Sequence, residues 1–366
     1  MALTWAKVLA WRLRRQLLDP RGPGSVADVV ERLGAVPAWP DAAAELAVGA
    51  RRTGATSGDV TKALAAGKVV KVYAFRGATH LMAPGAAGSY LAVRGSSRMW
   101  ELPSWESYYG LAPADWPPLR EYVRRALDEG PLTRTELAEA FGRSSRYRHL
   151  RTVVAEGNDT LLKPLTWQGD MGLGPGRDGE ATFLRLDRVP GWAGIPDPDE
   201  AGPTVIVAYL RTYGPAAADQ VHDWVGKGLG AKRRAVTRWL DQLDDRCEHI
   251  TVDGDRVLML RDDVDDLSAT SVSSAVRLLP GRDPWVMAPG TSDVRVVPPA
   301  HREAVSRSAN LVVYRGVVAG TWTLRHERLH IAWFEESGRV PRAALDEEAA
   351  VLATLLGRPL EARVDA

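Results

Sequence analysis

The chain has 366 residues, of which 45% are hydrophobic and 25% charged, and its formal net charge is +1. This is a soluble globular composition on a length that favours two to four domains or repeated modules. The single cysteine, Cys247, excludes an internal disulfide and a thiolate metal site, and no run of about 18 apolar residues is present to cross a membrane.

The expected compartment and the expected lack of cofactors are inferred from three sequence features that are missing. Residues 1–20 begin with an apolar stretch but carry four basic side chains, without the order of a signal peptide, so a cytoplasmic protein is expected. The seven histidines show no metal-ligand spacing, and no Gly-Lys-Ser/Thr loop is present to cradle a phosphate. We therefore expect no metal and no cofactor. A net charge near zero does not exclude nucleic acid, since a local basic face can coexist with an acidic one.

The first unusual segment runs from Glu31 to Leu46 with the sequence ERLGAVPAWPDAAAEL. Its two ends have residues typical of helices, so we expect two helices joined by a short irregular turn. Two prolines and Trp39 occupy this turn, and proline does not continue a helix. Asp41 stands where the second helix would begin and is placed to cap it, with Glu45 one helical turn further on.

A pattern of helices followed by a β-hairpin recurs three times along the chain. The predicted hairpins are VVKVYAF (69–75) with ATHLM (78–82), LLKPLTW (161–167) with MGLGP (171–175), and CEHITV (247–252) with RVLML (256–260). The second and third follow helix signals in DEGPLTRTELAEAFG (128–142) and RTYGPAAADQVHDWVG (211–226), where apolar residues recur at helical spacing. A helix-turn-helix followed by a hairpin is a winged-helix module, and three in tandem is the simplest interpretation.

The C-terminal part has a different sequence pattern, which predicts mainly strands. Short strand-like runs alternate with glycine and charged turns from residue 275 to 336, and a final helix is predicted from Pro341 to about Leu356. The predicted fold is therefore α+β, with three tandem winged helix-turn-helix modules followed by a C-terminal β-barrel-like domain. The predicted boundaries are 1–95, 96–193, 194–266 and 267–366, with GIPDPDEAGP (194–203) as a linker.

Positive charge gathers where each module would place the helix that lies in or across a DNA groove. The arginines of the second module are Arg143, Arg146, Arg148 and Arg151; the third module has Lys232, Arg233 and Arg234; Arg51 and Arg52 close a helix of the first. Guanidinium groups suit phosphate oxygens, so these runs are candidate contacts to double-stranded DNA. The alternative is that each run is an ordinary solvated helix face, or that the modules are scaffolds for other proteins.

The chain also resembles a known family. The segments LGAVPAWPDAAAELAVGAR, VYAFRGATHLMAP, LLKPLTWQGDMGLGPG, PGW, VRLLPGRDP and VAGTWTL appear in an order that is similar to the AlkZ-like (YcaQ-like) winged-helix DNA glycosylases of bacteria. The resemblance covers nearly the whole chain. It implies a monomer with three winged helices and a C-terminal β-barrel, wrapped in a C-shape around duplex DNA. It also implies excision of bulky or crosslinking alkylated purines without a metal or redox cofactor.

The family's catalytic Gln-x-Gln tripeptide falls on Pro37, Ala38 and Trp39 when it is laid on without a gap. Cleavage of an N-glycosidic bond builds oxocarbenium character on the sugar, and a glutamine amide can orient the attacking water by donating and accepting hydrogen bonds. Proline offers no side-chain hydrogen bond, and tryptophan offers only a donor. The catalytic turn of the family is therefore expected here without its catalytic groups.

Several nearby side chains are candidates for a role at this turn. Asp41 or Glu45 could replace the glutamines, because a carboxylate stabilises an oxocarbenium ion or activates water; the alternative is that both only cap the helix. His80 and Arg76 match the DNA-facing hairpin, or serve as structural residues of its turn. Trp39 either stacks on an unpaired base or, as we favour from the sequence, fills the vacated pocket as a plug beneath the prolines.

The sequence thus predicts a DNA-binding protein similar to glycosylases that excise bulky or crosslinking alkylated purines, with a divergent catalytic turn. Two branches remain within this prediction, one that cleaves through another group and one that binds without cleaving. The alternative function is a non-enzymatic winged-helix protein that binds DNA by sequence or sequesters a DNA-reactive metabolite.

Overall fold

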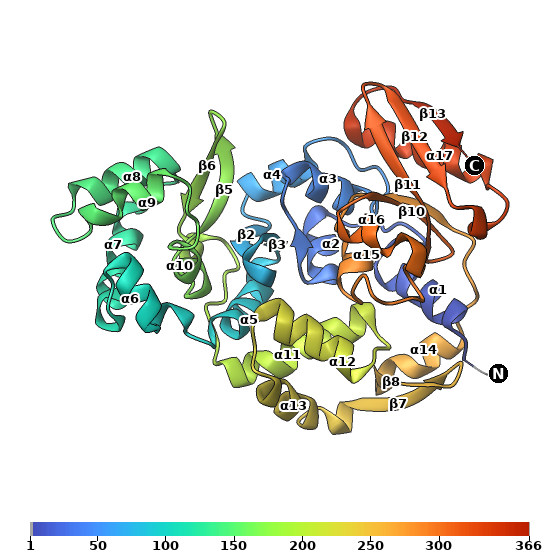
Figure 1. The fold of residues 1–366 in the computed structure, drawn as a ribbon, viewed down its shortest axis with the longest axis horizontal. Helices are drawn as coiled ribbons and strands as arrows, with labels where there is room; N and C mark the ends of the chain where they lie inside the picture. Colours follow the sequence, from blue (N-terminus) through green and yellow to red (C-terminus); the bar gives the residue numbers. More distant parts are fainter. Residues whose placement is uncertain (1–2, 366) are drawn as a thin grey trace.

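The computed structural model describes residues 3–365, and the chain folds as a mixed α+β protein, which confirms the predicted α+β class (Figure 1). One end of the molecule is a helical lobe with α6 (Pro103–Tyr109), α7 (Trp116–Ala126), α8 (Arg134–Arg143) and α9 (Arg151–Ala155). The opposite end holds the C-terminal strands and the last helix, above the N-terminal helix (Figure 1).

The N-terminal helices form where caps and apolar periodicity favour them. In the second helix, Ser25 accepts a hydrogen bond from the backbone of Asp28, whose carboxylate accepts one from the backbone of Ser25. This reciprocal capping box satisfies two backbone donors that a helix start leaves open. The helices of this part are α1 (Trp5–Arg15), α2 (Val26–Leu33), α3 (Asp41–Gly49), α4 (Asp59–Ala65) and α5 (Pro84–Gly95). The irregular turn predicted between α2 and α3 is confirmed.

A six-stranded antiparallel sheet joins the first two hairpins, in the order β1-β3-β2-β5-β6-β4. Its strands are β1 (Val36–Pro37), β2 (Val70–Tyr73), β3 (Thr79–Met82), β4 (Leu132–Thr133), β5 (Gly172–Arg177) and β6 (Glu180–Leu184). The register Lys71↔Leu173 connects the two hairpins. The hairpins β2–β3 and β5–β6 therefore belong to one sheet.

The second hairpin lies further along the chain than the sequence predicted. The run LLKPLTW contributes the helix α10 (Lys163–Trp167) instead of a strand, and the hairpin is β5–β6. Leu161, Leu162 and Leu165 are fully buried, which a short helix achieves as well as a strand does. Pro164 sits in the first turn of α10, where its missing N–H costs no hydrogen bond.

The third helical region begins inside the predicted linker. Asp197 accepts a hydrogen bond from the backbone of Asp199 and Pro198 is the first helical residue, so 198–203 belongs to a long helix and the linker prediction is wrong there. The elements are α11 (Pro198–Tyr213), α12 (Ala218–Val221), a π-helix η6 (His222–Gly228), α13 (Arg233–Asp241), β7 (Cys247–Val252), β8 (Asp255–Leu260) and α14 (Val264–Ser268). Asp253 and Gly254 both have positive φ between β7 and β8, which confirms the predicted hairpin turn.

The C-terminal part is a five-stranded sheet in the order β13-β12-β11-β10-β9, with a helix packed on it. Its elements are β9 (Val276–Leu279), α15 (Pro284–Met287), α16 (Arg302–Ser306), β10 (Asn310–Tyr314), β11 (Val317–Arg325), β12 (Arg328–Trp333), α17 (Arg342–Leu356) and β13 (Glu361–Asp365). The predicted strands and final helix are confirmed, and β13, which pairs parallel to β12, was not predicted. Strands β9 and β13 are the two edges, with no pairing between them in residues 3–365.

One apolar core reaches from the first sheet to the third helical region. It contains Val72 on β2, Leu91 on α5, Leu165 on α10, Val205 on α11 and Trp239 on α13. Close-packed cores deform little, so elements that share this core hold fixed positions relative to one another. The cleft described next takes two of its walls from these elements.

Candidate functional site

A cleft of about 850 Å³ lies where three distant parts of the chain meet. One wall is the β1 turn with residues 75–80, the second is α12 with the π-helix, and the third is the segment from Arg282 to Ser306 around α15 and α16. Concave sites of this size, with aromatic walls and a few charged groups, are the usual form of a ligand site. A π-helix of seven residues is rare in itself, and such turns occur often at functional sites.

The turn that carries Pro37 and Trp39 is fixed by its neighbours. Gly34 ends α2 with φ of 72°, and a Cβ there would lie 2.1 Å from Oη of Tyr90, so only glycine fits. Pro37 pairs with His80 across β1 and β3. The Ala38 amide donates to the carbonyl of Thr79 at 2.9 Å, and the Thr79 hydroxyl donates to the Ala38 carbonyl at 2.8 Å. These bonds bury Ala38, while Pro37 and Trp39 on either side of it line the cleft.

Trp39 lines this cleft without filling it. Its exposed fraction is 66%, so the prediction of a buried plug is wrong. The third wall, which the sequence analysis did not place near this turn, lies across the cleft from it. The guanidinium of Arg282 on that wall lies 5.5 Å from the centroid of the indole ring.

The two carboxylates proposed as substitutes for the glutamines point elsewhere. Asp41 forms an ion pair with Lys71 and lies in the first turn of α3, whose N-cap is Pro40. Glu45 accepts hydrogen bonds from the backbone amides of Val60 at 3.1 Å and Thr61 at 2.9 Å, so it caps α4. The predicted capping of α3 by Asp41 is therefore wrong, and both side chains lie outside the cleft lining.

His80 belongs to an aromatic wall of the cleft. Its ring lies 5.3 Å from Phe75, which lies 4.6 Å from Trp224. Burial lowers the pKa of His80 to about 4, although its hydrogen bond to the carbonyl of Ala78 acts in the opposite direction. His80 is thus neutral at pH 7, and it presents an uncharged ring to the cleft.

The opposite wall supplies acidic and amide groups that the sequence analysis did not select. Asp219 and Asp223 line the cleft from α12 and the π-helix, and they pair with Arg233 at 3.2 Å and Lys227 at 2.6 Å. Their spacing of four residues places them on one helix face, which is a signal that could have been read from the sequence.

Gln220 on this wall is bonded to Asp293 on the third wall, and the polar atoms of both side chains are engaged within the protein. The Gln220 carboxamide accepts from the backbone of Ala217 at 2.9 Å and donates to Asp293 at 3.0 Å. The other carboxylate oxygen of Asp293 accepts from the backbone of Arg295 at 3.1 Å. The two side chains therefore join the second wall of the cleft to the third.

Cations at the cleft come from scattered positions. Arg76, at a positive φ, is exposed on the loop between β2 and β3, and Arg282 and Arg302 join it from the third wall. Within residues 3–365, no acidic side chain forms an ion pair with any of these three. Unpaired guanidinium groups around a cleft suit a polyanion.

The first module's two other arginines have different partners. Arg51 is fully buried and forms a bidentate pair with Asp283 at 2.7 and 2.8 Å, so its predicted contact with DNA is wrong. Its guanidinium also donates to the carbonyl of Ala47. Arg52 is partly buried, where it donates to Asp59 at 2.8 Å and to the carbonyl of Gly24. Both hold the structure between α3 and its neighbours.

The remaining predicted cations lie outside the lining of the cleft. In the helical lobe, Arg143, Arg146, Arg148 and Arg151 are all exposed, and Arg146 pairs with Asp115 at 2.5 Å. They do not share one helix, because residues 144–147 between α8 and the following turns are not helical. Lys232, Arg233 and Arg234 are exposed at the start of α13. Lys232 and Arg234 border a separate recess with Ser96 and Ser97.

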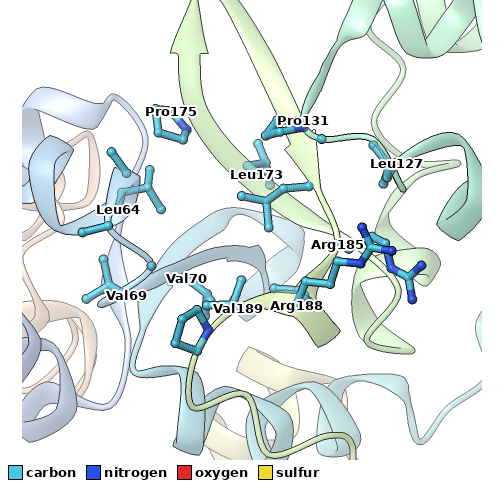
Figure 2. Close-up of a pocket in the computed structure, with 17 residues that line it drawn as sticks. Leu64, Val69, Val70, Leu127, Pro131, Leu173, Pro175, Arg185, Arg188 and Val189 are labelled. Carbon is cyan, nitrogen blue, oxygen red and sulfur yellow. The ribbon is translucent and has the colours of Figure 1, made fainter.

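A second recess, of about 420 Å³, lies between the first two hairpins (Figure 2). Leu64, Val69 and Leu173 give it an apolar lining. Its two arginines, Arg185 and Arg188, are both paired with Asp128. With its charges neutralised, this recess offers no group for catalysis.

Two further results bear on function. In the part of the chain that the structure describes, no group of three or more histidine, cysteine, aspartate or glutamate side chains could hold a metal ion. None of the helices described in residues 3–365 combines the length and apolar character that a membrane span requires.

Comparisons with known proteins give the same assignment over almost the whole chain. A sequence profile for a family described as DNA glycosylase AlkZ-like matches residues 30–355. The chain is 35% identical over 363 residues to the interstrand DNA cross-link repair glycosylase of Streptomyces sahachiroi, with 98% of each chain covered. The solved structure of Streptomyces sahachiroi DNA glycosylase AlkZ matches 100% of both chains with a TM-score of 0.92 and 34% identity.

Proposed function

The chain belongs to the AlkZ-like DNA glycosylase family, and we propose that it binds alkylated or crosslinked duplex DNA at the cleft without hydrolysing the glycosidic bond. The relative from Streptomyces sahachiroi is named for repair of interstrand crosslinks, which makes such DNA the first substrate to test. Two of the three unpaired arginines of the cleft, Arg76 and Arg302, would contact the phosphate backbone.

The proposed architecture has three winged-helix units and a C-terminal barrel-like domain. The hairpins β2–β3, β5–β6 and β7–β8 support it, because each follows a set of helices. The sheet β9–β13 with α17 would be the C-terminal domain. In this arrangement the exposed arginines of the lobe and of α13 add sequence-independent contacts to a longer duplex, bound by a cytoplasmic monomer.

The proposed absence of hydrolysis rests on one observation, which is that no free carboxamide side chain of residues 3–365 lines the cleft. Pro37 and Trp39 stand where the family places its two glutamines, and neither side chain can both donate to and accept from a water. In the described chain, Gln220 is the only carboxamide side chain that lines the cleft, and both of its ends are bonded within the protein. No amide is therefore left to orient the attacking water.

Two carboxylates remain to be tested as substitutes. Asp219 and Asp223 are exposed on the wall of the cleft, where a carboxylate could activate water or stabilise the oxocarbenium ion. Each already pairs with a cation, and both stand on a different wall from the turn that performs this task in the family. We assign them no step in catalysis.

The test combines binding and base release on one substrate. Fluorescence anisotropy with duplex oligonucleotides that carry an N7-alkylpurine should show binding that weakens steeply with salt, and the same mixtures should release no base above the uncatalysed rate. The double variant Pro37→Gln/Trp39→Gln should gain release, because it returns the two amides to the cleft. Tyr108→Gln, which adds a carboxamide outside the cleft lining, is the matched control and should gain none.

Two results would overturn the proposal. Absence of salt-dependent binding to any duplex would remove the DNA-binding function. Base release by the unmodified protein would remove the claim that it binds without cleaving, and Asp219→Asn and Asp223→Asn would then identify the group that acts.

A further inference from the structure

The cleft displays apolar side chains that a folded protein normally covers. Of the six large hydrophobic side chains that are exposed in residues 3–365, Trp39 at 66% and Val294 at 62% both line it. Phe75, Trp224 and Met287 add further apolar surface to its walls. Exposed apolar surface gathered in one concavity, bordered by unpaired arginines, indicates a ligand with a flat apolar body and negative charge.

The backbone that carries Trp39 is restrained on both sides. Pro37 and Pro40 restrict the chain around it, and the two hydrogen bonds between Ala38 and Thr79 attach the turn to β3. A turn restrained in this way loses little further backbone freedom when a ligand covers Trp39. This pre-organisation favours binding.

Arg282 faces the indole from the third wall and is itself anchored. Its Nε donates to the hydroxyl of Ser308 at 2.6 Å, and its backbone has φ of 62°. The guanidinium lies 5.5 Å from the centroid of the Trp39 ring. Arginine presents a planar group that stacks on aromatic faces and keeps its charge at every physiological pH.

The buried pair of Arg51 and Asp283 links the chain segments that carry these two residues. Trp39 precedes α3 and Arg51 follows it, whereas Asp283 is the immediate neighbour of Arg282. Both side chains of the pair have an exposed fraction of 0%. One fully buried contact therefore attaches the turn of Trp39, through α3, to the segment of Arg282.

We infer that Trp39 and Arg282 form a clamp in which a planar aromatic ring stacks on the exposed indole while the Arg282 guanidinium contacts the edge of that ring, and that this ring is a nucleobase displaced from the duplex. The inference rests on the proposed function. The choice of a nucleobase over a free aromatic molecule follows from Arg76 and Arg302, which flank the cleft and suit the phosphates on either side of a displaced nucleotide. Trp39 and Arg282 are specificity-determining residues in this assignment.

A duplex with 2-aminopurine opposite an abasic site tests the clamp directly, since fluorescence of this base falls when it stacks on an indole. Trp39→Ala should leave the bound base bright and lower the affinity for this duplex by about tenfold, the typical effect of removing one base–aromatic stack. Trp39→Phe should restore part of the fluorescence quenching and part of the affinity. Arg282→Lys should weaken binding of this duplex although it keeps the charge. Affinity for fully paired duplex should not change in any of them.

Tyr108 provides the matched control, since it is an aromatic side chain of 71% exposure on α6, in the lobe and outside the cleft lining. Tyr108→Ala should behave as the unmodified protein does. If Trp39→Ala binds duplex DNA but matches the unmodified protein in both fluorescence and affinity, the clamp is wrong while the proposed function stands. If the unmodified protein binds no duplex at all, the proposed function fails first.

A third arm separates the two sources of an aromatic ring. The nucleoside 7-methylguanosine, titrated without DNA, should bind weakly, because it lacks the flanking phosphates. Binding of this free nucleoside with an affinity equal to that of the 2-aminopurine duplex, abolished in Trp39→Ala, would overturn the assignment to a displaced base and favour a free aromatic ligand.

Discussion

The cleft and the helical lobe both carry exposed arginines, but they obtain them in different ways. In the lobe, four arginines lie within residues 143–151, so a local run of sequence produces the basic surface. In the cleft, Arg76 is far along the chain from Arg282 and Arg302, and the three meet only because three walls converge. Arginines that the fold brings together have one spatial arrangement and therefore suit one ligand geometry. Arginines in a local run can contact the phosphates of any duplex.

Arginines that are similar in their sequence context also differ in their structural roles. Arg51 and Arg52 are neighbours, and both were predicted to contact DNA, yet both are held by carboxylates within the protein. Arg76, an isolated residue in a hairpin loop, is the one from this module that faces the cleft. Density of charge along the chain is thus a weaker guide to an interface than a concave surface that leaves charges unpaired.

The largest expected effect would break the contrast between buried and exposed arginines. Arg51→Met should lower the free energy of unfolding by about 3–5 kcal/mol, because it leaves the carboxylate of Asp283 buried without a partner. Urea unfolding followed by circular dichroism measures this change. The control is Arg233→Met, which removes the exposed partner of Asp219 and should leave stability nearly unchanged. Equal destabilisation of the two variants would show that burial does not set the role of Arg51.

The next effect concerns the neutral ring in the wall of the cleft. An unfolded chain protonates His80 near its ordinary pKa of about 6.5, but the folded protein does so only near 4. The unfolded state therefore takes up the proton first as pH falls, and the free energy of unfolding should decrease between pH 6.5 and 4 by up to about 3 kcal/mol.

This component is measured as the difference in pH dependence between the unmodified protein and His80→Asn in urea unfolding. The variant should lack it, since asparagine does not titrate and can still donate to the carbonyl of Ala78. His326→Asn, on an exposed turn, should keep the same decline as the unmodified protein. A pH profile that His80→Asn leaves unaltered would contradict the burial of a neutral histidine.

The smallest effect sharpens the comparison between cleft and lobe. Arg76→Gln/Arg302→Gln should weaken binding to lesion-bearing duplex more than to undamaged duplex. Arg143→Gln/Arg148→Gln should weaken both equally. The slope of log K against log salt should become shallower by about 0.9 for each phosphate that is no longer neutralised by an arginine. A lobe variant that discriminates between the two duplexes would reverse the assignment of the regions.

Local patterns predicted much of the fold. The hairpin around Asp253 and Gly254 needs two residues with positive φ, and Asp-Gly provides them. The final helix and the strands β9 to β12 also follow from periodicity within each segment. The prediction failed at LLKPLTW, because a short apolar run fits a buried helix as well as a strand. It failed again at β13, whose parallel pairing with β12 is made across the whole of α17.

The candidate site was predicted in part for the same reason. The sequence identified the turn of Pro37 and Trp39, and with Arg76 and His80 it gave one wall. The wall of Asp219 and Asp223 and the wall of Arg282 were missed, since no local pattern links them to that turn. The substitutes chosen near the turn, Asp41 and Glu45, were wrong because the side chains are directed toward Lys71 and the start of α4, and not toward the cleft.

The sequence by itself predicted the family and the turn that carries Pro37 and Trp39, because these depend on the order of residues along the chain. Tertiary structure decided that Trp39 is exposed, that Arg51 is buried against Asp283, and that Arg282 faces the indole. The physical reason is that burial and unpaired charge are properties of surfaces from distant segments, and those surfaces exist only once the core has brought the segments together.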